Sequence, residues 1–314
     1  MKSTENKTII CLMGPTASGK TQLAVELVQR FSCEIISVDS AMVYRGMDIG
    51  TAKPDAQILK IAPHKLLDIR DPANAYSAAD FCKDAFAVIE DIISRKKIPL
   101  LVGGTMMYFN ALQKGLSDLP SADIAIREKL NLELQAVGTQ AMHARLQKID
   151  PDAALRIHAH DAQRIQRALE VFEMTGKSLT ELQKNTFSIL SNYKIINLAI
   201  TPNDRSILHE RIAKRFLLML EAGFIDEVKA LFLRDDLNLN TPAIRSVGYR
   251  QAWEYLLGQL SYDEMIEKGI IATRQLAKRQ LTWLRHWTQP LQWFDSEAGD
   301  LVSQVSLSLT QEIK

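Results

Sequence analysis

Gly14-Pro15-Thr16-Ala17-Ser18-Gly19-Lys20-Thr21 is the stretch that decides the fold, because it lies between a strand-like and a helix-like segment. Residues 8–13 (TIICLM) before it are almost continuously apolar, as a buried strand requires, and residues 23–28 (LAVELV) after it carry apolar side chains at helical spacing. A strand, a glycine-containing loop and a helix in this order are the context in which the pattern GxxxxGK[ST] binds phosphate groups. The stretch therefore predicts a site for a diphosphate or a triphosphate.

The residue types of this loop explain how it binds an anion. Its glycines let the backbone curve so that N–H groups point inward, and the start of the following helix adds partial positive charge. Lys20 supplies a full positive charge, and the Thr21 hydroxyl is placed to bind Mg²⁺. The residues predicted to bind a diphosphate or a nucleotide such as ATP are Gly14, Pro15, Thr16, Ala17, Ser18, Gly19, Lys20 and Thr21.

The N-terminal part of the chain alternates strand-like and helix-like segments. Strand-like runs occupy residues 34–38, 65–69 and 98–102, and residues 77–95 have a helical pattern that Ser77 can cap. Such alternation predicts a parallel sheet with helices on both faces, and ligands then gather at the carboxyl ends of the strands. We therefore expect an α/β fold, with a parallel sheet of the P-loop NTPase type flanked by helices.

The character of the chain changes after residue 119. Residues 122–190 contain no strand-like run and read as several short helices, separated by glycines and an Asp-Pro pair. Strand-like residues return at 193–200 and at 292–294, with a mostly helical region between them. We therefore expect an all-helical domain inserted into the α/β core. The expected segments are 1–118 for the first part of the core, 119–191 for the insertion, and 192–314 for the return to the core with C-terminal helices.

Composition limits the possible partners and compartments. The 314 residues carry a net charge of +1 with 46% hydrophobic and 24% charged residues, so any binding to nucleic acid must come from local clusters of Lys and Arg. Cys11, Cys33 and Cys82 are odd in number and far apart, which favours buried free thiols over disulfides. No run of about 18 apolar residues occurs. We expect a cytoplasmic, monomeric protein with no membrane partner.

Polar residues follow three of the expected strands at the same edge of the sheet. Asp39 ends the strand-like run 34–38, where a carboxylate can hold Mg²⁺ through water or act as a general base. The alternative is an aspartate that only caps the next turn, but its position opposite the phosphate loop favours a functional role. Gly103-Gly104-Thr105 follow the run 98–102 and suit either a ligand or a tight turn.

Basic residues cluster in three places. Arg164 and Arg167 share a helix face, Arg245 and Arg250 flank a Val-Gly-Tyr segment, and residues 274–285 contain four basic residues and no acid. Together these clusters favour a polyanion such as RNA, whereas a solvated helix face is the alternative for any single one. The tryptophans among them, Trp283 and Trp287, are expected in the core. Spacing alone also favours a solvated position for Arg127, although an arginine there could clamp a leaving diphosphate.

Several segments together resemble the tRNA dimethylallyltransferases (tRNA isopentenyltransferases) of the bacterial type. The resemblance extends over residues 9–294, and its most specific segments are 48–54 (DIGTAKP) and 244–251 (IRSVGYRQ). Residues 37–40, 101–105 and 273–280 also match, whereas the phosphate loop alone is shared with many kinases. The tail after residue 294 lies outside the resemblance and shows no pattern of its own.

The resemblance implies a reaction. Dimethylallyl diphosphate gives its five-carbon group to N6 of adenosine 37, beside the anticodon of a tRNA, and diphosphate leaves with the assistance of Mg²⁺. It implies that Lys20 and the phosphate loop hold the diphosphate, that Asp39 accepts the N6 proton, and that Thr105 and Arg127 orient the diphosphate and the substrate. The base must be turned out of the anticodon loop to reach such a site. The helical insertion 119–191 then grips the anticodon stem-loop.

The resemblance also implies four segments that contact tRNA, three of which contain the basic clusters. Their residues are Asp39, Ser40, Ala41, Met42, Gln163, Arg164, Ile165, Gln166, Arg167, Arg245, Ser246, Val247, Gly248, Tyr249, Arg250, Lys278, Arg279, Gln280, Leu281, Thr282, Trp283, Leu284 and Arg285.

A small-molecule kinase is the alternative function. It would bind ATP at the same loop and use Asp39 as the base for a hydroxyl group, with the helical insertion as a lid. Both functions require Mg²⁺, so metal dependence does not separate them. A kinase, however, gives no reason for the basic residues at 274–285. An RNA-binding protein with a nucleotide switch is a third class, but the chain has no Asn-Lys-x-Asp motif for guanine.

Overall fold

The computed structural model describes residues 7–117, 119–120, 123–184 and 188–313, and the chain forms two compact units. Met1–Asn110 and Asn192–Lys314 form the first, which we call the core unit, and Ala111–Ser191 form the second, the helical unit. The chain therefore leaves the core unit once and returns to it. Residue 118, where the sequence analysis ends its first segment, lies outside the described residues.

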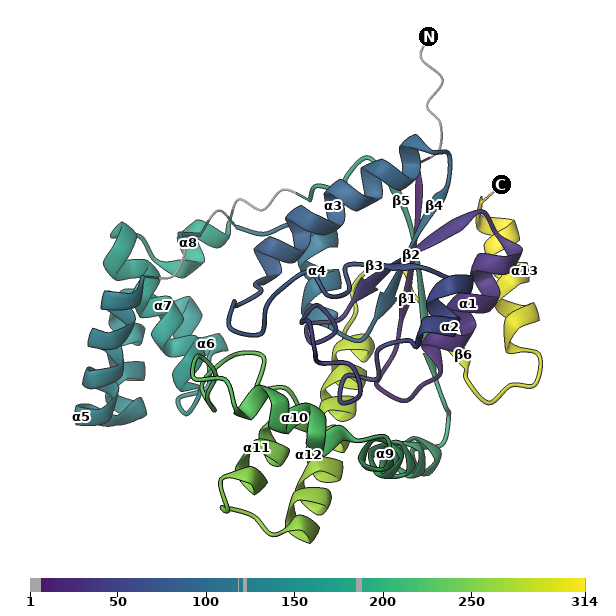
Figure 1. Ribbon diagram of the computed structural model, residues 1–314. Coiled ribbons are helices and arrows are strands. Elements are labelled where there is room, and N and C mark those ends of the chain that lie inside the picture. The colour runs from purple at the N-terminus through teal and green to yellow at the C-terminus, as the bar shows by residue number, and fades with distance from the viewer. Residues whose placement is uncertain (1–6, 118, 121–122, 185–187, 314) are drawn as a thin grey trace. The chain divides into compact units, whose positions relative to one another are not determined.

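The core unit contains a six-stranded parallel sheet in the order β3-β2-β4-β1-β5-β6 (Figure 1). The expected α/β fold with a parallel sheet is confirmed, and five of the six expected strands are present with at most small shifts at their ends. Their bounds are β1 Thr8–Met13, β2 Cys33–Val38, β3 His64–Lys65, β4 Ile98–Gly103, β5 Lys194–Thr201 and β6 Gln292–Asp295.

One expected strand is much shorter than its apolar pattern suggests. The run at residues 65–69 contributes only Lys65 to β3, because the chain turns directly afterwards. Leu66 and Asp68 adopt positive φ values of 65° and 55°, which cannot continue a strand. The Asp68 carboxylate is bound by the Lys53 ammonium at 2.6 Å, so a tertiary contact stabilises this turn.

The strand register brings three turns to one level of the sheet. Gly103 at the end of β4 lies opposite Met13 of β1 on one side and Val38 of β2 on the other. The residues that follow these three are Gly14, Asp39 and Gly104, so each turn leaves the sheet at the same row. The predicted convergence of the phosphate loop, Asp39 and the Gly103-Gly104-Thr105 turn is therefore built into the pairing.

Helices cover both faces of the sheet (Figure 1). Alternate residues of β1, such as Ile10 and Leu12, pack with α1 (Lys20–Arg30) and α13 (Leu301–Ile313) in one core cluster. α2 (Ala56–Ile61) is short, and α3 (Ala78–Ser94) and α4 (Met106–Lys114) cover the other face. α3 begins at the expected Ser77, which forms a capping box with Asp80. α13 lies in the tail for which the sequence showed no pattern, although its Val305 and Leu309 are fully buried.

A group of helices lies beyond the carboxyl ends of the strands (Figure 1). It consists of α9 (Arg205–Glu221), α10 (Phe224–Phe232), α11 (Tyr249–Leu256) and α12 (Tyr262–Arg285). Ile212 of α9 and Leu281 of α12 belong to a buried cluster against which Ala17 of the phosphate loop packs. The late part of the sequence is thereby placed against the loop near its start.

The helical unit has a core of its own. Its elements α5 (Ile124–Ile149), α6 (Pro151–Arg156), α7 (Ala162–Thr175) and α8 (Leu179–Gln183) pack around buried residues that include Leu130 and Leu169. Gly138 interrupts α5 with a φ of 79°, and Gly176 ends α7 in the left-handed conformation. The glycines that separate helical patterns in the sequence thus do so in the structure.

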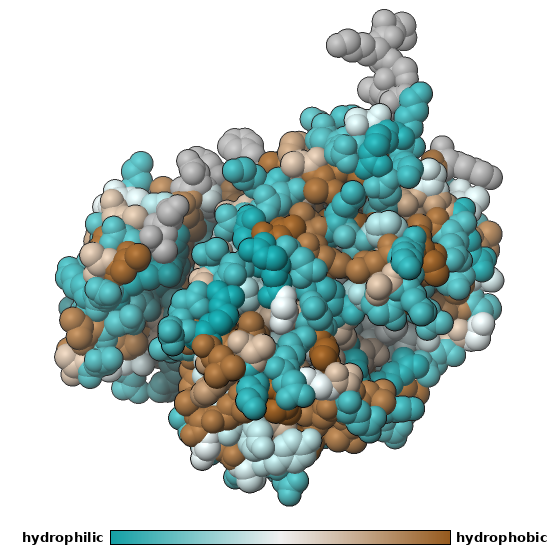
Figure 2. Space-filling view, in the orientation of Figure 1, coloured by the Kyte–Doolittle hydropathy of each residue, from teal (hydrophilic) through white to brown (hydrophobic). Residues whose placement is uncertain are grey.

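Among the described residues, no helix is both long and apolar enough to cross a bilayer. On the face shown in Figure 2 hydrophilic side chains predominate, and hydrophobic ones gather over the helices beyond the strand ends. Leu233 and Leu257, which follow α10 and α11, are among the exposed apolar residues of that region.

Candidate active site

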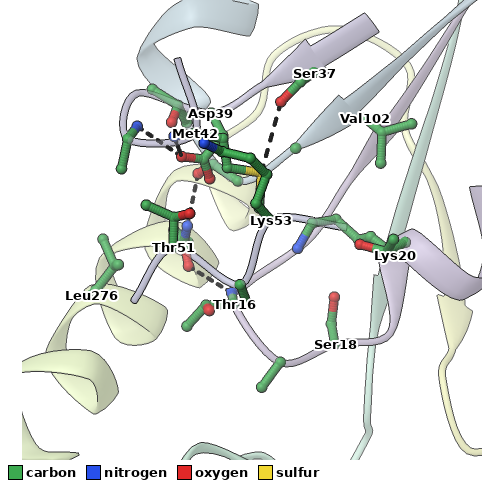
Figure 3. Close-up of a pocket in the computed structure, with 18 of the residues that line it drawn as sticks. Thr16, Ser18, Lys20, Ser37, Asp39, Met42, Thr51, Lys53, Val102 and Leu276 are labelled. Carbon is green, nitrogen blue, oxygen red and sulfur yellow. Dashed lines mark hydrogen bonds between the residues drawn. The ribbon is translucent and has the colours of Figure 1, made fainter. Parts of the chain in front are cut away.

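A cavity of about 1540 Å³ opens at the carboxyl edge of the sheet (Figure 3). Its lining comes from the phosphate loop, the turns after β2 and β4, the loop at residues 50–55, α9, α12 and the segment before α11, all within the core unit. Of the residues predicted to bind diphosphate, all but Gly14 and Pro15 line this cavity. A site of this size can hold a small diphosphate and a second group beside it.

The phosphate loop is shaped for an anion. Ala17 and Gly19 adopt positive φ values of 64° and 86°, a conformation that turns successive N–H groups to one side. α1 begins directly after them with no side-chain cap and no acidic residue in its first turn. The buried Ser18 hydroxyl has no hydrogen-bond partner in the described part of the chain. The loop therefore presents several donors that an external anion can satisfy.

Two cations in the cavity lack a carboxylate partner. The Lys20 ammonium donates to the Pro15 carbonyl at 2.6 Å, and the guanidinium of Arg215, on α9, donates to the Thr16 hydroxyl at 2.5 Å. Among the ion pairs of the described residues, none includes Lys20 or Arg215. Burial, together with the nearby charge of Arg215, lowers the pKa of Lys20 to about 7, and the Asp39 carboxylate opposes this shift. Burial also lowers the pKa of Arg215. Both groups would gain from a bound anion.

Arg215 is a site residue that the sequence pattern does not predict. It lies one helical turn after Arg211 in a mixed polar and apolar helix, and such a pair of arginines is common on solvated faces. Only the packing of α9 against the phosphate loop gives Arg215 its place, and no local pattern encodes that contact.

Asp39 caps the turn after β2 and also lines the cavity. Its Oδ1 atom accepts hydrogen bonds from the backbone N–H groups of Ala41 and Met42 at 2.8 and 3.2 Å, so it caps the turn after β2. The side chain also lines the cavity and influences the pKa of Lys20 and of Arg215, which places its charge close to both. In the described residues Oδ2 makes no hydrogen bond. One carboxylate oxygen thus holds the turn while the other is available for chemistry.

Thr105 lies beside this turn. Its hydroxyl accepts a hydrogen bond from the Ser40 N–H at 3.1 Å, and its own N–H donates to the Val38 carbonyl at 3.2 Å. Asp39, Ser40 and Thr105 all line the cavity. The structure therefore brings together the two polar turns that the sequence placed at one sheet edge.

Gln280 of α12 connects the phosphate loop to the turn after β4. Its Oε1 accepts from the Thr16 N–H and its Nε2 donates to the Gly104 carbonyl, both at 2.8 Å. A Cβ on Gly104 would lie 2.4 Å from that Nε2, so a side chain at this position would displace the bridge. The resemblance placed Gln280 among the tRNA contacts, but its amide is already occupied at both ends within the protein.

Lys53, in the DIGTAKP segment, is not available to bind phosphate. Its ammonium contacts the carboxylates of Asp48 and Asp68 and donates to the Tyr44 carbonyl at 3.0 Å. Its side chain is 5% exposed. Figure 3 shows Lys53 with Asp39 and Thr51 on one side of the cavity, whereas Lys20 and Ser18 come from the other. Lys53 therefore stabilises the loop that carries it.

Four residues of the expected tRNA segments in the core unit are exposed at the cavity: Ser40, Arg245, Arg279 and Trp283. Trp283 is 42% exposed, so the expectation that it belongs to the core is wrong. It shares the cavity-facing side of α12 with Leu276 and Gln280, at helical spacing, and this face turns away from the packed core.

Several other residues of these segments are buried, paired within the protein, or exposed away from the cavity. The side chains of Tyr249, Leu281 and Leu284 are buried, as is Gly248, and Arg250 is paired with Glu254 at 3.0 Å. Lys278, Thr282 and Arg285 are exposed elsewhere on α12 and do not line this cavity. Buried members of such a segment fix its backbone, and only the exposed polar ones can meet RNA directly.

In the helical unit, a buried glutamate organises the expected site residues. Glu170 is fully buried and accepts from Arg127 Nε at 2.9 Å and from Arg167 Nη1 at 2.7 Å. Gln166 donates to Asn131 and to the Arg127 carbonyl, while Ile165 packs in the core. Arg127 and Arg167 are thus held as a pair, and Arg127 remains about half exposed with 48% of its side chain accessible.

The donor set at the cavity suits magnesium. Among the described residues no group of three His, Cys, Asp or Glu side chains forms a metal cage. Magnesium does not need one, since it keeps several waters and binds substrate phosphates together with one or two protein oxygens. The Thr21 hydroxyl in the first turn of α1 and the Asp39 carboxylate both line the cavity and provide such oxygens.

Comparison with known proteins identifies the family. A family model described as IPP transferase matches residues 42–287. The chain belongs to the IPP transferase family. Because the matched region begins after the phosphate loop, this membership does not depend on a motif that kinases share. No finding supports the kinase alternative.

Solved structures of IPP transferases agree in fold over almost the whole chain. The full-length tRNA isopentenylpyrophosphate transferase of Bacillus halodurans is 36% identical, with 98% of this chain and 97% of that chain covered and a TM-score of 0.72. The tRNA delta(2)-isopentenylpyrophosphate transferase of Staphylococcus epidermidis is 31% identical over 97% of this chain and 99% of that chain, with a TM-score of 0.69. A eukaryotic dimethylallyltransferase acting on tRNA is 29% identical, covers 97% and 79%, and has a TM-score of 0.80. The resemblance inferred from the sequence motifs is confirmed.

Proposed function

We propose that this IPP transferase moves a dimethylallyl group from dimethylallyl diphosphate to N6 of adenosine 37 in tRNA. The observation that carries the proposal is a pair of uncompensated cations, Lys20 and Arg215, facing Asp39 across one cavity. Family membership and the three structural relatives support the reaction class. The choice of adenosine 37 rests on the resemblance of the sequence motifs.

The phosphate loop binds the diphosphate of the donor. Its N–H groups, the N-terminus of α1 and the Lys20 ammonium surround the anion, and Arg215 approaches from α9 through its contact with Thr16. When the C–O bond of the donor breaks, its electron pair remains on the diphosphate. Groups that bind the departing charge more strongly than the bound ester lower the barrier.

The acceptor nitrogen attacks from the side of Asp39. The N6 lone pair forms the new bond to the allylic carbon, and the N6 proton passes to the free Oδ2 of Asp39. Thr105, held by the Ser40 N–H, offers its hydroxyl to the base or to the donor. An exocyclic amine is a weak nucleophile, so orientation at short distance supplies much of the rate. A magnesium ion, held by the Thr21 hydroxyl, would neutralise charge on the diphosphate.

RNA is bound by exposed basic residues. Arg245 and Arg279 line the cavity without hydrogen bonds from their side chains in the described residues, so they are available for phosphate groups. Trp283 beside them offers an exposed ring on which a base can stack. In the helical unit we assign the same role to Gln163 and Arg164, the exposed members of the expected segment 163–167, with Arg127 oriented by Glu170. The helical unit then binds the anticodon stem-loop.

A labelling experiment tests the proposal. The protein is incubated with radiolabelled dimethylallyl diphosphate, magnesium and an anticodon stem-loop that carries adenosine 37. The matched control is the same RNA with guanosine at that position. We expect label only in the first RNA, and no phosphorylated product when ATP replaces the donor. An unlabelled adenosine RNA, or consumption of ATP with phosphorylation of a metabolite, would contradict the assignment.

A further inference from the structure

Glu227 of α10 gathers four hydrogen bonds from two distant segments. Its carboxylate accepts from the successive backbone N–H groups of Asp48, Ile49 and Gly50 at 2.8, 2.7 and 3.0 Å. It also accepts from the Tyr249 hydroxyl at 2.5 Å. Three consecutive N–H groups that converge on one anion form a nest, and each hydrogen bond to a carboxylate is stronger than a neutral one.

The two segments that Glu227 joins both form part of the cavity wall. Gly50 begins the part of the DIGTAKP segment that lines the cavity, and Tyr249 follows Arg245, which lines it as well. These are the segments that made the sequence resemblance specific. We call them together the acceptor wall, residues 48–54 and 245–249.

Packing leaves the acceptor wall little freedom. Tyr249 is fully buried, and its ring meets Phe224 of α10 edge-on with centroids 5.1 Å apart. A Cβ at Gly50 would lie 2.2 Å from Phe224 and 2.6 Å from Tyr249. The backbone of the loop therefore lies directly on the two rings, and the Glu227 carboxylate fixes it there.

The contacts of Glu227 are confined to this wall. No ion pair of the described residues includes Glu227, so backbone N–H groups and one hydroxyl stabilise its charge. The phosphate loop is held separately, by Gln280, Arg215 and the packing of Ala17. Loss of the Glu227 charge should consequently disturb one side of the cavity and spare the other.

We propose that Glu227 is a positioning residue that fixes the acceptor wall and thereby sets affinity for tRNA without affecting affinity for the diphosphate donor. The inference rests on the proposed function, in which Arg245 and its neighbours meet the RNA. It assigns a role to a residue outside the phosphate loop, the Asp39 turn and the basic clusters.

Glu227→Gln tests the inference, because the amide keeps one acceptor but turns an NH₂ group toward backbone donors. We expect the KM for tRNA to rise about tenfold, as loss of charged hydrogen bonds implies, while the KM for the donor stays within about twofold. The matched control is Asp226→Asn, in the same turn of α10, whose exposed side chain makes no hydrogen bond in the described residues. Equal changes in both KM values, or the same change in the control, would overturn the inference.

A milder variant and a binding-independent measurement complete the test. Tyr249→Phe keeps the buried ring and removes one donor, so it should raise the KM for tRNA less than Glu227→Gln does. The double variant should raise this KM by less than the product of the two single increases. Hydrogen exchange of residues 48–50 without substrates should accelerate in Glu227→Gln. Unchanged exchange would overturn the inference even in an active enzyme. Accelerated exchange in a protein whose wild type leaves tRNA unprenylated would instead overturn the proposed function.

Discussion

The two sides of the cavity differ in whether their charged side chains have partners within the protein. On the donor side, Lys20 and Arg215 have no carboxylate within ion-pair distance among the described residues, and the Ser18 hydroxyl is unpaired there as well. On the acceptor wall, Lys53 is matched by two aspartates and a carbonyl, and Glu227 by three N–H groups and a hydroxyl.

The unpaired groups of the donor side are available to bind a ligand, whereas the paired groups of the acceptor wall stabilise the conformation of the protein. A buried cation without a partner weakens the folded state and is retained where a bound anion supplies the missing charge. A cation with several partners contributes to the fold and has little left to offer a substrate. The same residue type, lysine, therefore has opposite roles at positions 20 and 53.

The largest expected effect is at Asp39, the proposed general base. Asp39→Asn retains the Oδ1 acceptor that caps Ala41 and Met42 but removes the basic carboxylate. We expect kcat to fall by about 10²–10⁴, the range for loss of a general base, with the melting temperature little changed. Single-turnover kinetics at saturating substrates measure this. A variant that keeps its normal kcat would show that Asp39 only caps the turn.

The sharpest test of the comparison is a matched pair of lysine substitutions. Lys20→Met should lower kcat/KM for the donor by about 10²–10³, as expected for a lost electrostatic contact to the leaving group. It should also raise the melting temperature. Lys53→Met should lower the melting temperature, because about 1.5–3 kcal/mol of charge-assisted hydrogen bonding is lost.

The pH at which the two lysine variants should be compared follows from the direction in which the pKa of Lys20 is shifted. The folded-state pKa of about 7 lies below the ordinary value of 10.5, so the charged lysine opposes folding most fully below pH 7. This cost declines as the pH rises from 7 toward 10.5. Thermal melts at pH 6 should therefore show opposite shifts for the two variants. If the two melting temperatures shifted in the same direction, the distinction between the donor side and the acceptor wall would be lost.

The donor affinity should depend on pH for the same reason. Above pH 7 the free protein holds Lys20 neutral, so binding of a diphosphate must take up a proton. Affinity should fall by up to about tenfold per pH unit between pH 7.5 and 9, where the donor itself is already ionised. Isothermal titration calorimetry in buffers of different ionisation enthalpy counts the proton, and Lys20→Met should take up none. If the wild type bound the diphosphate without taking up a proton, the result would contradict the lowered pKa of Lys20.

The smallest expected effect concerns the exposed arginine of α12. Arg279→Ala should weaken tRNA binding about threefold at moderate salt and reduce the salt slope by about one. Lys214→Ala is the control, since Lys214 is exposed on α9 and does not line the cavity. Filter binding over a range of salt concentrations compares the two. An unchanged slope would mean that Arg279 does not meet the RNA backbone.

The sequence predicted the features that short segments encode. The phosphate loop, the strand before it, the position of Asp39 and the cap at Ser77 each depend on neighbouring residues, and all are present. The family was also accessible, because the DIGTAKP and IRSVGYRQ segments are specific.

What the sequence could not provide depends on packing between distant segments. Arg215 and Gln280 reach the phosphate loop only because α9 and α12 fold over it. Glu227 contacts residues 48–50, which are distant from it in the sequence. Lys53 is nearly buried by partners at Tyr44, Asp48 and Asp68, which its own segment does not indicate. Trp283 was assigned to the core from its residue type, but its helix face is turned to the cavity. In each case the position of the side chain depends on the segment against which it packs, and the residue type alone does not indicate that segment.

The bridge at Gln280 has a consequence for biosynthesis. Because this residue and Arg215 complete the surroundings of Thr16, the loop that leaves the ribosome early has no finished binding site until α9 and α12 have been translated. A truncated product that ends before α12 should therefore fail to trap dimethylallyl diphosphate in the cell. The site is therefore completed only late in synthesis, when α12 brings Gln280 against the phosphate loop.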